Sequence, residues 1–224
     1  MKRRKRLPIY LMAGLLISGM LLLPGSGISM AEVDHSLFDG LLKNNVSNGS
    51  VDYKGFKNSE KILDQYLKVL EGVKPETLSR DDQFAFYINA YNAWTIKLIL
   101  TGYPGVKSIK DLGSLLSSPW KKKIAWINGK IMTLDEIEHS ILRPRFNDPR
   151  VHFAVNCASN SCPPLRQEAY QGHKLDSQLN DATRKFLADT ANNYLDGNEL
   201  YASRIFKWFG DDFNQDIAGF FIQY

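Results

Sequence analysis

Both cysteines of this 224-residue chain and one of its four histidines fall in a single stretch, residues 151–165. The stretch reads VHFAVNCASNSCPPL, so a strand-like alternation gives way to small polar residues closed by two prolines. The alternation predicts a β-strand over 151–156 that delivers Cys157 to the end of a core element. A nucleophile or metal ligand held at a strand end is better positioned than one on a free loop. We therefore expect any chemistry of this protein to occur here.

Three kinds of chemistry suit these residues. Cys157 and Cys162 could form a disulfide, because four intervening residues let their Cα atoms come within bonding reach. Cys157 could instead be a thiolate nucleophile activated by His139 or His152. The two cysteines and two histidines also have the ligand types of a zinc site, but the H-x4-C-x4-C spacing is not a usual structural knuckle. We expect neither a metal nor a cofactor. The choice between a structural Cys157–Cys162 disulfide (a staple) and a nucleophilic Cys157 stays open.

A catalytic cysteine needs a base within hydrogen-bond reach and a third group that orients this base. On an extended strand His152 would face away from the sulfur atom of Cys157. His139, which arrives from the preceding helix, is then the better base. Glu138, Asn89 and Asn92 are the candidate orienting groups, and the backbone amides of the cysteine loop are candidate oxyanion donors.

The two asparagines belong to a run, residues 83–100, that is apolar nearly all round. Such a pattern predicts a buried central helix, and Ser79 is its expected N-cap. Both amides should therefore be out of water and hydrogen-bonded. They either tie the helix to a neighbouring backbone or line a site.

The helix expected over 134–142 brings Glu138 and His139 to the cysteines. Thr133 and Glu136 have the spacing of a capping box at its start. Glu138 points within the inner face, where a carboxylate costs several kcal/mol unless it is paired. We expect it to meet an arginine, a histidine or the buried amides, either as a structural ion pair or as a catalytic group.

The other elements predict a single α+β domain that is mainly helical, with a buried central helix and a small antiparallel sheet or hairpins. The Asn128-Gly129 pair is typical of a tight hairpin turn. The further helices are expected over 32–45, 59–70, 109–116, 175–189 and 203–209, and the hairpins over 123–133 and 194–201.

Residues 1–31 have the features of an export signal, with a basic start, an apolar run and a small-x-small cleavage site. An uncleaved amino-terminal membrane anchor is the alternative. In either case residues 32–224 form the exported domain, in the periplasm or at the cell surface, and only the amino-terminal segment would touch a membrane.

The basic character of the chain lies mostly in this segment. Without Lys2 to Arg6, its five basic residues, the 28 Lys and Arg fall to 23 against 24 Asp and Glu. The only internal basic run is 121–123, so the sequence predicts no nucleic-acid partner, which would need a clustered positive surface.

Several motifs together resemble the domain of unknown function 547 family. They are NAYNA at 89–93, TLDEIEH at 133–139, ILR at 141–143, VHFAVNCAS at 151–159, SCPPL at 161–165 and SRIFKWF at 203–209. The resemblance runs in order from about Val51 to Phe213. It implies an exported single-domain protein of the bacterial type, whereas plant members carry the domain behind a coiled-coil segment that is absent from this sequence.

The resemblance also bears on the cysteines. In plant members the positions that match Cys157 and the Glu138-His139 pair tend to be kept, whereas the position that matches Cys162 is often serine. A disulfide is then not common to the family. The resemblance therefore supports catalysis by Cys157 about as much as a structural disulfide.

Two functional hypotheses follow, and the sequence leaves open whether the protein is an enzyme. The leading hypothesis is a cysteine-dependent hydrolase or acyl transferase that acts on an unknown small-molecule, peptide-like or amide substrate. Its rival is a noncatalytic exported binding or scaffold domain with a structural Cys157–Cys162 disulfide.

Overall fold

The structure is a computed structural model that describes residues 32–114, 117–158 and 162–224. The expected signal peptide or membrane anchor, residues 1–31, lies outside the described residues. No helix in the described ranges is both long and apolar enough to cross a membrane.

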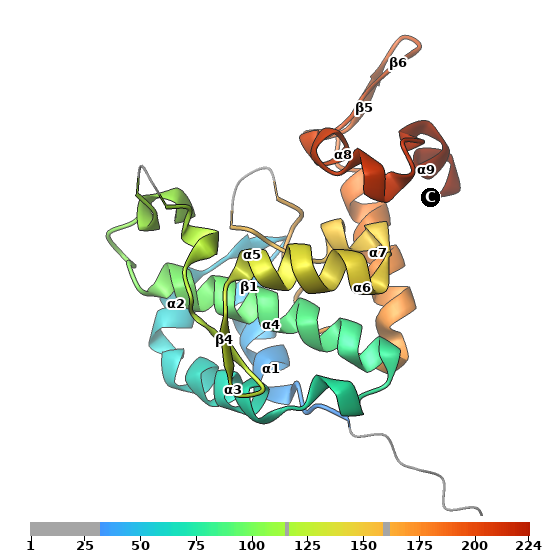
Figure 1. Ribbon diagram of the computed structural model, residues 1–224. Coiled ribbons are helices and arrows are strands. Elements are labelled where there is room, and N and C mark those ends of the chain that lie inside the picture. Colours follow the sequence, from blue (N-terminus) through green and yellow to red (C-terminus); the bar gives the residue numbers. More distant parts are fainter. Residues whose placement is uncertain (1–31, 115–116, 159–161) are drawn as a thin grey trace, which may run out of the picture.

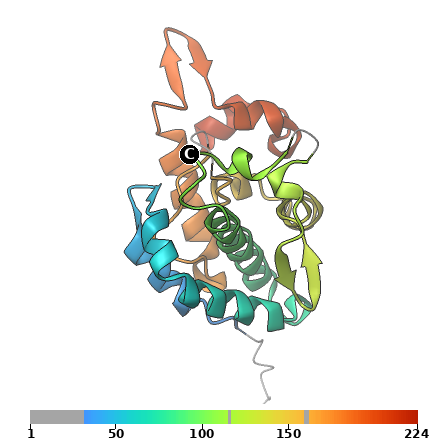
Figure 2. The same ribbon diagram turned by 90° about the vertical axis from the view of Figure 1, so that its left-hand side faces the viewer.

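The helix α4 (Arg80–Leu100) runs through the middle of the molecule with other helices around it (Figures 1 and 2). Ser79 caps its first turn, because its side chain accepts a hydrogen bond from the backbone amide of Asp82. Seventeen of its 21 residues are buried. The prediction of a buried central helix is therefore confirmed.

The remaining helices pack around α4 and at the carboxyl end. The α-helices are α1 (Ser36–Asn45), α2 (Tyr53–Asn58), α3 (Glu60–Gly72), α5 (Leu134–Glu136), α6 (Arg143–Phe146), α7 (Leu175–Leu187), α8 (Arg204–Trp208) and α9 (Ile217–Gln223). The short 3-10 helices are η1 (Pro75–Thr77), η2 (Ile109–Leu112), η3 (Pro119–Lys121), η5 (Pro149–Phe153), η6 (Gly172–Lys174) and η7 (Gly210–Phe213).

The strands form three separate antiparallel hairpins. They are β1 (Val46–Ser47) with β2 (Ser50–Val51), β3 (Ala125–Ile127) with β4 (Lys130–Met132), and β5 (Tyr194–Asp196) with β6 (Glu199–Tyr201). Asn128 and Gly129 have φ angles of 48° and 68°, as the predicted tight turn requires. The fold is thus the expected mainly helical α+β domain with small hairpins, β5 and β6 projecting from the body (Figure 1).

The helix that carries Glu138 is longer and wider than expected. The predicted capping box is present, since the Thr133 amide donates to Glu136 at 2.7 Å and the Glu136 amide donates to Thr133 at 3.0 Å. After α5 the chain widens into a π-helix, Ile137–Leu142, before α6. Pro144 has no amide hydrogen to donate, so the regular α-helical bonding cannot continue unchanged through it. Such π-turns are frequent at functional sites.

The predicted strand over 151–156 is wrong. Residues 149–153 form the 3-10 helix η5, with Pro149 in its first turn and the Asp148 side chain accepting from the amide of Arg150. Val151, His152 and Phe153 are all buried, so no face of this segment meets solvent. The alternation therefore reflected burial on every side and not a strand with one wet face.

Phe153 belongs to a second aromatic cluster at the carboxyl end. It packs with Phe186 of α7, Phe206 of α8, Phe213 of η7 and Phe220 of α9. The rings bring η7 against η5, although about 60 residues separate the two in sequence. This packing sets the position of His152, the neighbour of Phe153.

Two buried asparagines tie α4 to distant backbone segments. The Asn89 side chain donates to the carbonyl of Tyr170 at 2.8 Å and accepts from its amide at 2.9 Å. The Asn92 side chain donates to the carbonyl of Ala154 at 3.0 Å and accepts from the amide of Asn156 at 2.9 Å. Each side-chain amide therefore pairs with one backbone carbonyl and one backbone amide, as a neighbouring strand would, and so holds a distant loop on the helix.

Asn89→Ala should lower the free energy of unfolding by roughly 2–4 kcal/mol, because it leaves both backbone groups of Tyr170 buried without a partner. Urea denaturation would measure this loss. Asn44→Ala is the matched control, since Asn44 is exposed on α1 and should change stability by less than about 0.5 kcal/mol. Equal midpoints for the two variants would contradict the role given to Asn89.

Candidate functional site

A cavity of about 260 Å³ opens between α4, η3, the π-helix, the cysteine loop and α8. Its titratable and thiol-bearing lining residues are Tyr91, Asp135, Glu138, His139, His152 and both cysteines. Aromatic rings of Trp120, Trp208 and Phe209 complete much of the wall. Four of the six predicted site residues therefore meet at one cavity: Cys157, His152, His139 and Glu138.

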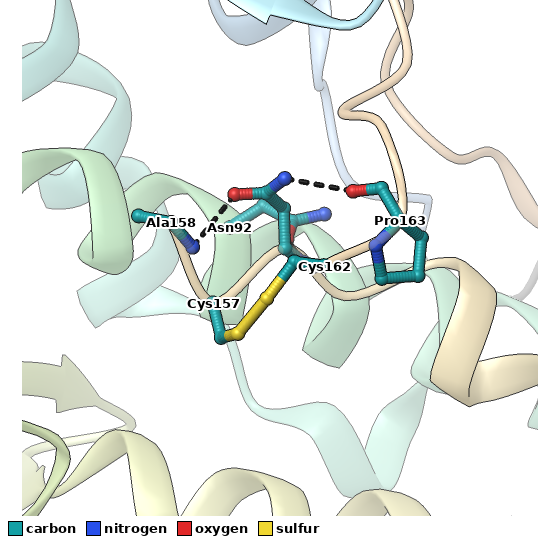
Figure 3. Close-up of a disulfide and its surroundings, with 6 residues drawn as sticks. Asn92, Cys157, Ala158, Cys162 and Pro163 are labelled. Carbon is teal, nitrogen blue, oxygen red and sulfur yellow. Dashed lines mark hydrogen bonds between the residues drawn. A yellow bond between two sulfur atoms is a disulfide. The ribbon is translucent and has the colours of Figure 1, made fainter. Parts of the chain in front are cut away.

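The two sulfur atoms lie within disulfide-bonding distance, and the structure joins them, with Cα atoms 6.0 Å apart (Figure 3). Asn156 braces both ends of this loop. Its side chain accepts from the amide of Ala158 at 2.9 Å and donates to the carbonyl of Pro163 at 2.8 Å (Figure 3). Cys157 and Cys162 are thus fixed side by side at the cavity wall.

His152 is held by a carboxylate from the carboxyl end of the chain. Its Nε2 lies 2.6 Å from Oδ2 of Asp212, and its ring stacks on Phe209 with centroids 4.0 Å apart. Burial lowers the pKa of His152 to about 4, although the bond to Asp212 opposes this. Burial acts to raise the pKa of Asp212, but hydrogen bonds from Arg143 and His152 outweigh it and keep that pKa low.

These shifts fix the proton positions at neutral pH. The Asp212 carboxylate is ionised and can only accept, so the neutral His152 ring carries its hydrogen on Nε2. Its Nδ1 then has a free lone pair. Nδ1 makes no hydrogen bond to any residue that the structure describes.

Arg143 connects this pair to His139. Its Nε and Nη2 grip Asp212 at 2.6 and 3.0 Å, and its Nη1 lies 3.2 Å from Nδ1 of His139. A guanidinium only donates, so Nδ1 of His139 accepts and its lone pair is occupied. The other nitrogen, Nε2, lies 3.9 Å from Asp135.

The geometry therefore no longer favours His139 over His152 as the base. The preference for His139 rested on a strand that would turn His152 away from Cys157. The strand is not formed, and His152 lines the same cavity as Cys157.

Glu138 does not form the expected ion pair. Burial raises its pKa, and the neighbouring His139, Tyr91 and Arg143 side chains only partly offset that effect. Across the described ranges no lysine or arginine lies within ion-pair distance of its carboxylate. The reason is that Arg143 bonds to Asp212, while Arg150 bonds to acids on its own segment and on α7.

The two asparagines do not line the cavity. Asn92 bonds to the backbone at the start of the cysteine loop, and Asn89 bonds to the backbone of Tyr170. Two of the candidate oxyanion donors are also occupied, because the amides of Asn156 and Ala158 bond to side-chain oxygens. Apart from the amide of Cys157, the other candidate amides, at 159–161, lie outside the described residues.

Sequence reasoning missed Asp212, Tyr91 and the aromatic wall. Asp212 comes three residues after the SRIFKWF motif, which was the only local signal near it. Tyr91 lies between the two asparagines, in a run whose apolar pattern predicts only burial in the core. No group of three or more His, Cys, Asp or Glu side chains in the described chain is placed to hold a metal ion, so the zinc arrangement is not formed.

Comparison with known proteins gives a family and no activity. No curated protein and no solved structure matches the chain. A family model, described as a protein of unknown function, DUF547, matches residues 75–187. This range holds α4, the π-helix, η5 and both cysteines, and it is half of the chain. The protein therefore belongs to the DUF547 family, as its motifs indicated.

Proposed function

We propose that the protein is a cysteine-dependent hydrolase or acyl transferase for amide or peptide-like substrates, with Cys157 as nucleophile and His152 as its base. One observation carries the proposal. Cys157 lines the same cavity as a buried, neutral imidazole that a carboxylate orients and whose second nitrogen bonds to none of the described residues. This is the logic of a nucleophile–base–acid triad.

In this mechanism Nδ1 of His152 removes the proton from the Cys157 thiol. The thiolate attacks the substrate carbonyl, and the tetrahedral intermediate collapses to a thioester as His152 returns the proton to the departing amine. Water, or a second nucleophile in a transferase, then attacks the thioester and gives its proton to His152. Cys157 is released as the thiol. Asp212 stabilises the imidazolium that forms twice in this cycle.

The mechanism requires the reduced protein. A sulfur atom bonded to Cys162 carries no thiol proton and cannot attack a carbonyl. The joined pair is therefore the inactive form, and a dithiol reductant, oxidised in the exchange, would release Cys157.

Alkylation rates test whether Cys157 is activated. In a Cys162→Ala variant, Cys157 should react with iodoacetamide at pH 7 at least about tenfold faster than Cys162 does in the matched Cys157→Ala variant, because the proposal assigns His152 as base to Cys157 alone. Adding His152→Gln to the first variant should remove the difference. Intact-mass time courses would measure the rates, and equal rates for the two single thiols would exclude the proposed nucleophile.

A neutral His152 has a consequence for stability. Its folded-state pKa of about 4 lies below the ordinary value of 6.5, so protons bind more readily to the unfolded chain. The contribution of the neutral His152 ring to the free energy of unfolding is fully present above pH 6.5 and is lost as the pH falls toward 4. The loss should reach at most about 3 kcal/mol.

His152→Gln should therefore show a weaker fall in unfolding free energy between pH 7 and pH 4 than the wild type. Urea titrations at both pH values give this double difference. His173→Gln is the matched control, because His173 is largely exposed. An identical pH dependence for wild type and His152→Gln would mean that the imidazole is not held neutral by burial.

The rival function is a noncatalytic binding or scaffold domain with a structural disulfide. It is favoured by the joined sulfur atoms and the bracing of both loop ends by Asn156. On this account reduction lowers the free energy of unfolding by roughly 2–3 kcal/mol through loop opening. Neither thiol is then unusually reactive. Equal melting temperatures of oxidised and reduced protein would count against a staple.

A further inference from the structure

The carboxylate of Glu138 faces the cavity without a cation of its own. No lysine or arginine lines the described part of this cavity, and the guanidinium of Arg143 is already shared between Asp212 and His139. Glu138 has no role in the proposed mechanism, in which Cys157 is the nucleophile and His152 the base. A desolvated carboxylate without a cation beside it costs free energy, so its presence at a cavity points to a ligand that supplies the positive charge.

Two hydrogen-bond donors in the same wall also lack ordinary partners. Tyr91 is fully buried, and its hydroxyl makes no hydrogen bond of standard geometry within the described residues, although it lies close enough to Glu138 for each to shift the pKa of the other. The buried Nε1 of Trp120 is likewise unpartnered among them. Buried donors of this kind are normally satisfied. Both residues line the cavity, but the two polar atoms themselves are closed to solvent in this structure.

The remaining wall of the cavity suits an organic ammonium compound with an apolar part. Trp120, Trp208 and Phe209 present aromatic surfaces, and an indole ring attracts ammonium groups more strongly than the rings of Tyr and Phe do. Trp208 is 57% exposed, so this part of the wall is open to solvent. The volume of about 260 Å³ is below the roughly 300–1,000 Å³ of sites for drug-sized ligands, so one side chain or end group fits.

We propose that this cavity selects substrates in which a primary ammonium group lies close to the amide carbonyl, and that Glu138 binds the ammonium group. An amino acid amide or the amino-terminal residue of a peptide has this chemistry. Glu138 is then a specificity-determining residue, and the aromatic wall holds the apolar part of the substrate. The inference names the substrate class of the same site and in that sense rests on the proposed function.

Binding of three small probes tests this directly. Phenethylamine, 2-phenylethanol and 3-phenylpropanoate share an aromatic body but carry a positive, neutral or negative end. The protein used is the full domain with Cys157→Ala and Cys162→Ala, so that no thiol chemistry contributes. Trp120 and Trp208 lie in the wall, so tryptophan fluorescence reports occupancy, and isothermal titration calorimetry confirms the affinities.

Phenethylamine should bind at least about tenfold more tightly than 2-phenylethanol, and 3-phenylpropanoate should bind most weakly. Glu138→Gln, which keeps the size of the side chain, should reduce the affinity for the amine to that for the alcohol and leave the alcohol unchanged. Asp135→Asn is the contrasting variant, because Asp135 lines the same cavity but is more exposed and should keep the preference for the amine.

Three outcomes would overturn the proposal: equal affinities for amine and alcohol, a preference for the carboxylate, or loss of the preference in Asp135→Asn and not in Glu138→Gln. If Glu138→Gln does not fold, the order of the three probes on the parent protein still decides. The result is independent of the catalytic proposal, because the cysteines are absent. A preference for the amine together with an unreactive Cys157 would support the amine-binding site and exclude the proposed cysteine catalysis.

Discussion

The carboxylate of Asp212 is the contact on which the candidate site depends. It accepts hydrogen bonds from His152 of η5 and from two nitrogens of Arg143, which begins α6, while Asp212 itself belongs to η7. One side chain thereby fixes η7 to α6 and η5, two neighbouring elements about 60 residues earlier in the chain. The same contact decides which nitrogen of His152 carries the hydrogen and occupies the guanidinium of Arg143, which forms no ion pair with Glu138. The tautomer of His152 and the lack of a cation beside Glu138 among the described residues thus both involve Asp212.

The features that could be predicted from sequence have local causes. An apolar surface on every side marks α4 as central wherever the rest of the chain lies, and Ser79 and Thr133 cap helices through bonds to residues three positions away. The Asn128-Gly129 turn needs only its own backbone angles. Cys157, His152, His139 and Glu138 could be grouped because they lie within 20 residues on consecutive elements.

The errors arise where tertiary packing overrides a local pattern. Residues 151–156 alternate like a strand, but the aromatic cluster around Phe153 and the bond to Asp212 bury this segment on all sides as a 3-10 helix. The choice of His139 as base depended on that strand. Nothing near Asp212 in the sequence indicates that it reaches across about 60 residues to His152. Likewise, Arg143 satisfies the expectation of an ion pair, but with Asp212 and not with Glu138.

The most direct test of the central claim is to trap an acyl group on the cysteine. Cys162→Ala protein would be incubated with p-nitrophenyl acetate and digested, and the site of acetylation mapped by mass spectrometry, with Cys157→Ala as the control. The account predicts a burst of about one p-nitrophenolate per chain and a thioester on Cys157, both absent when His152 is replaced by Gln. Acetylation confined to surface lysines, with Cys157 unmodified, would contradict it and leave the joined cysteines as a structural staple.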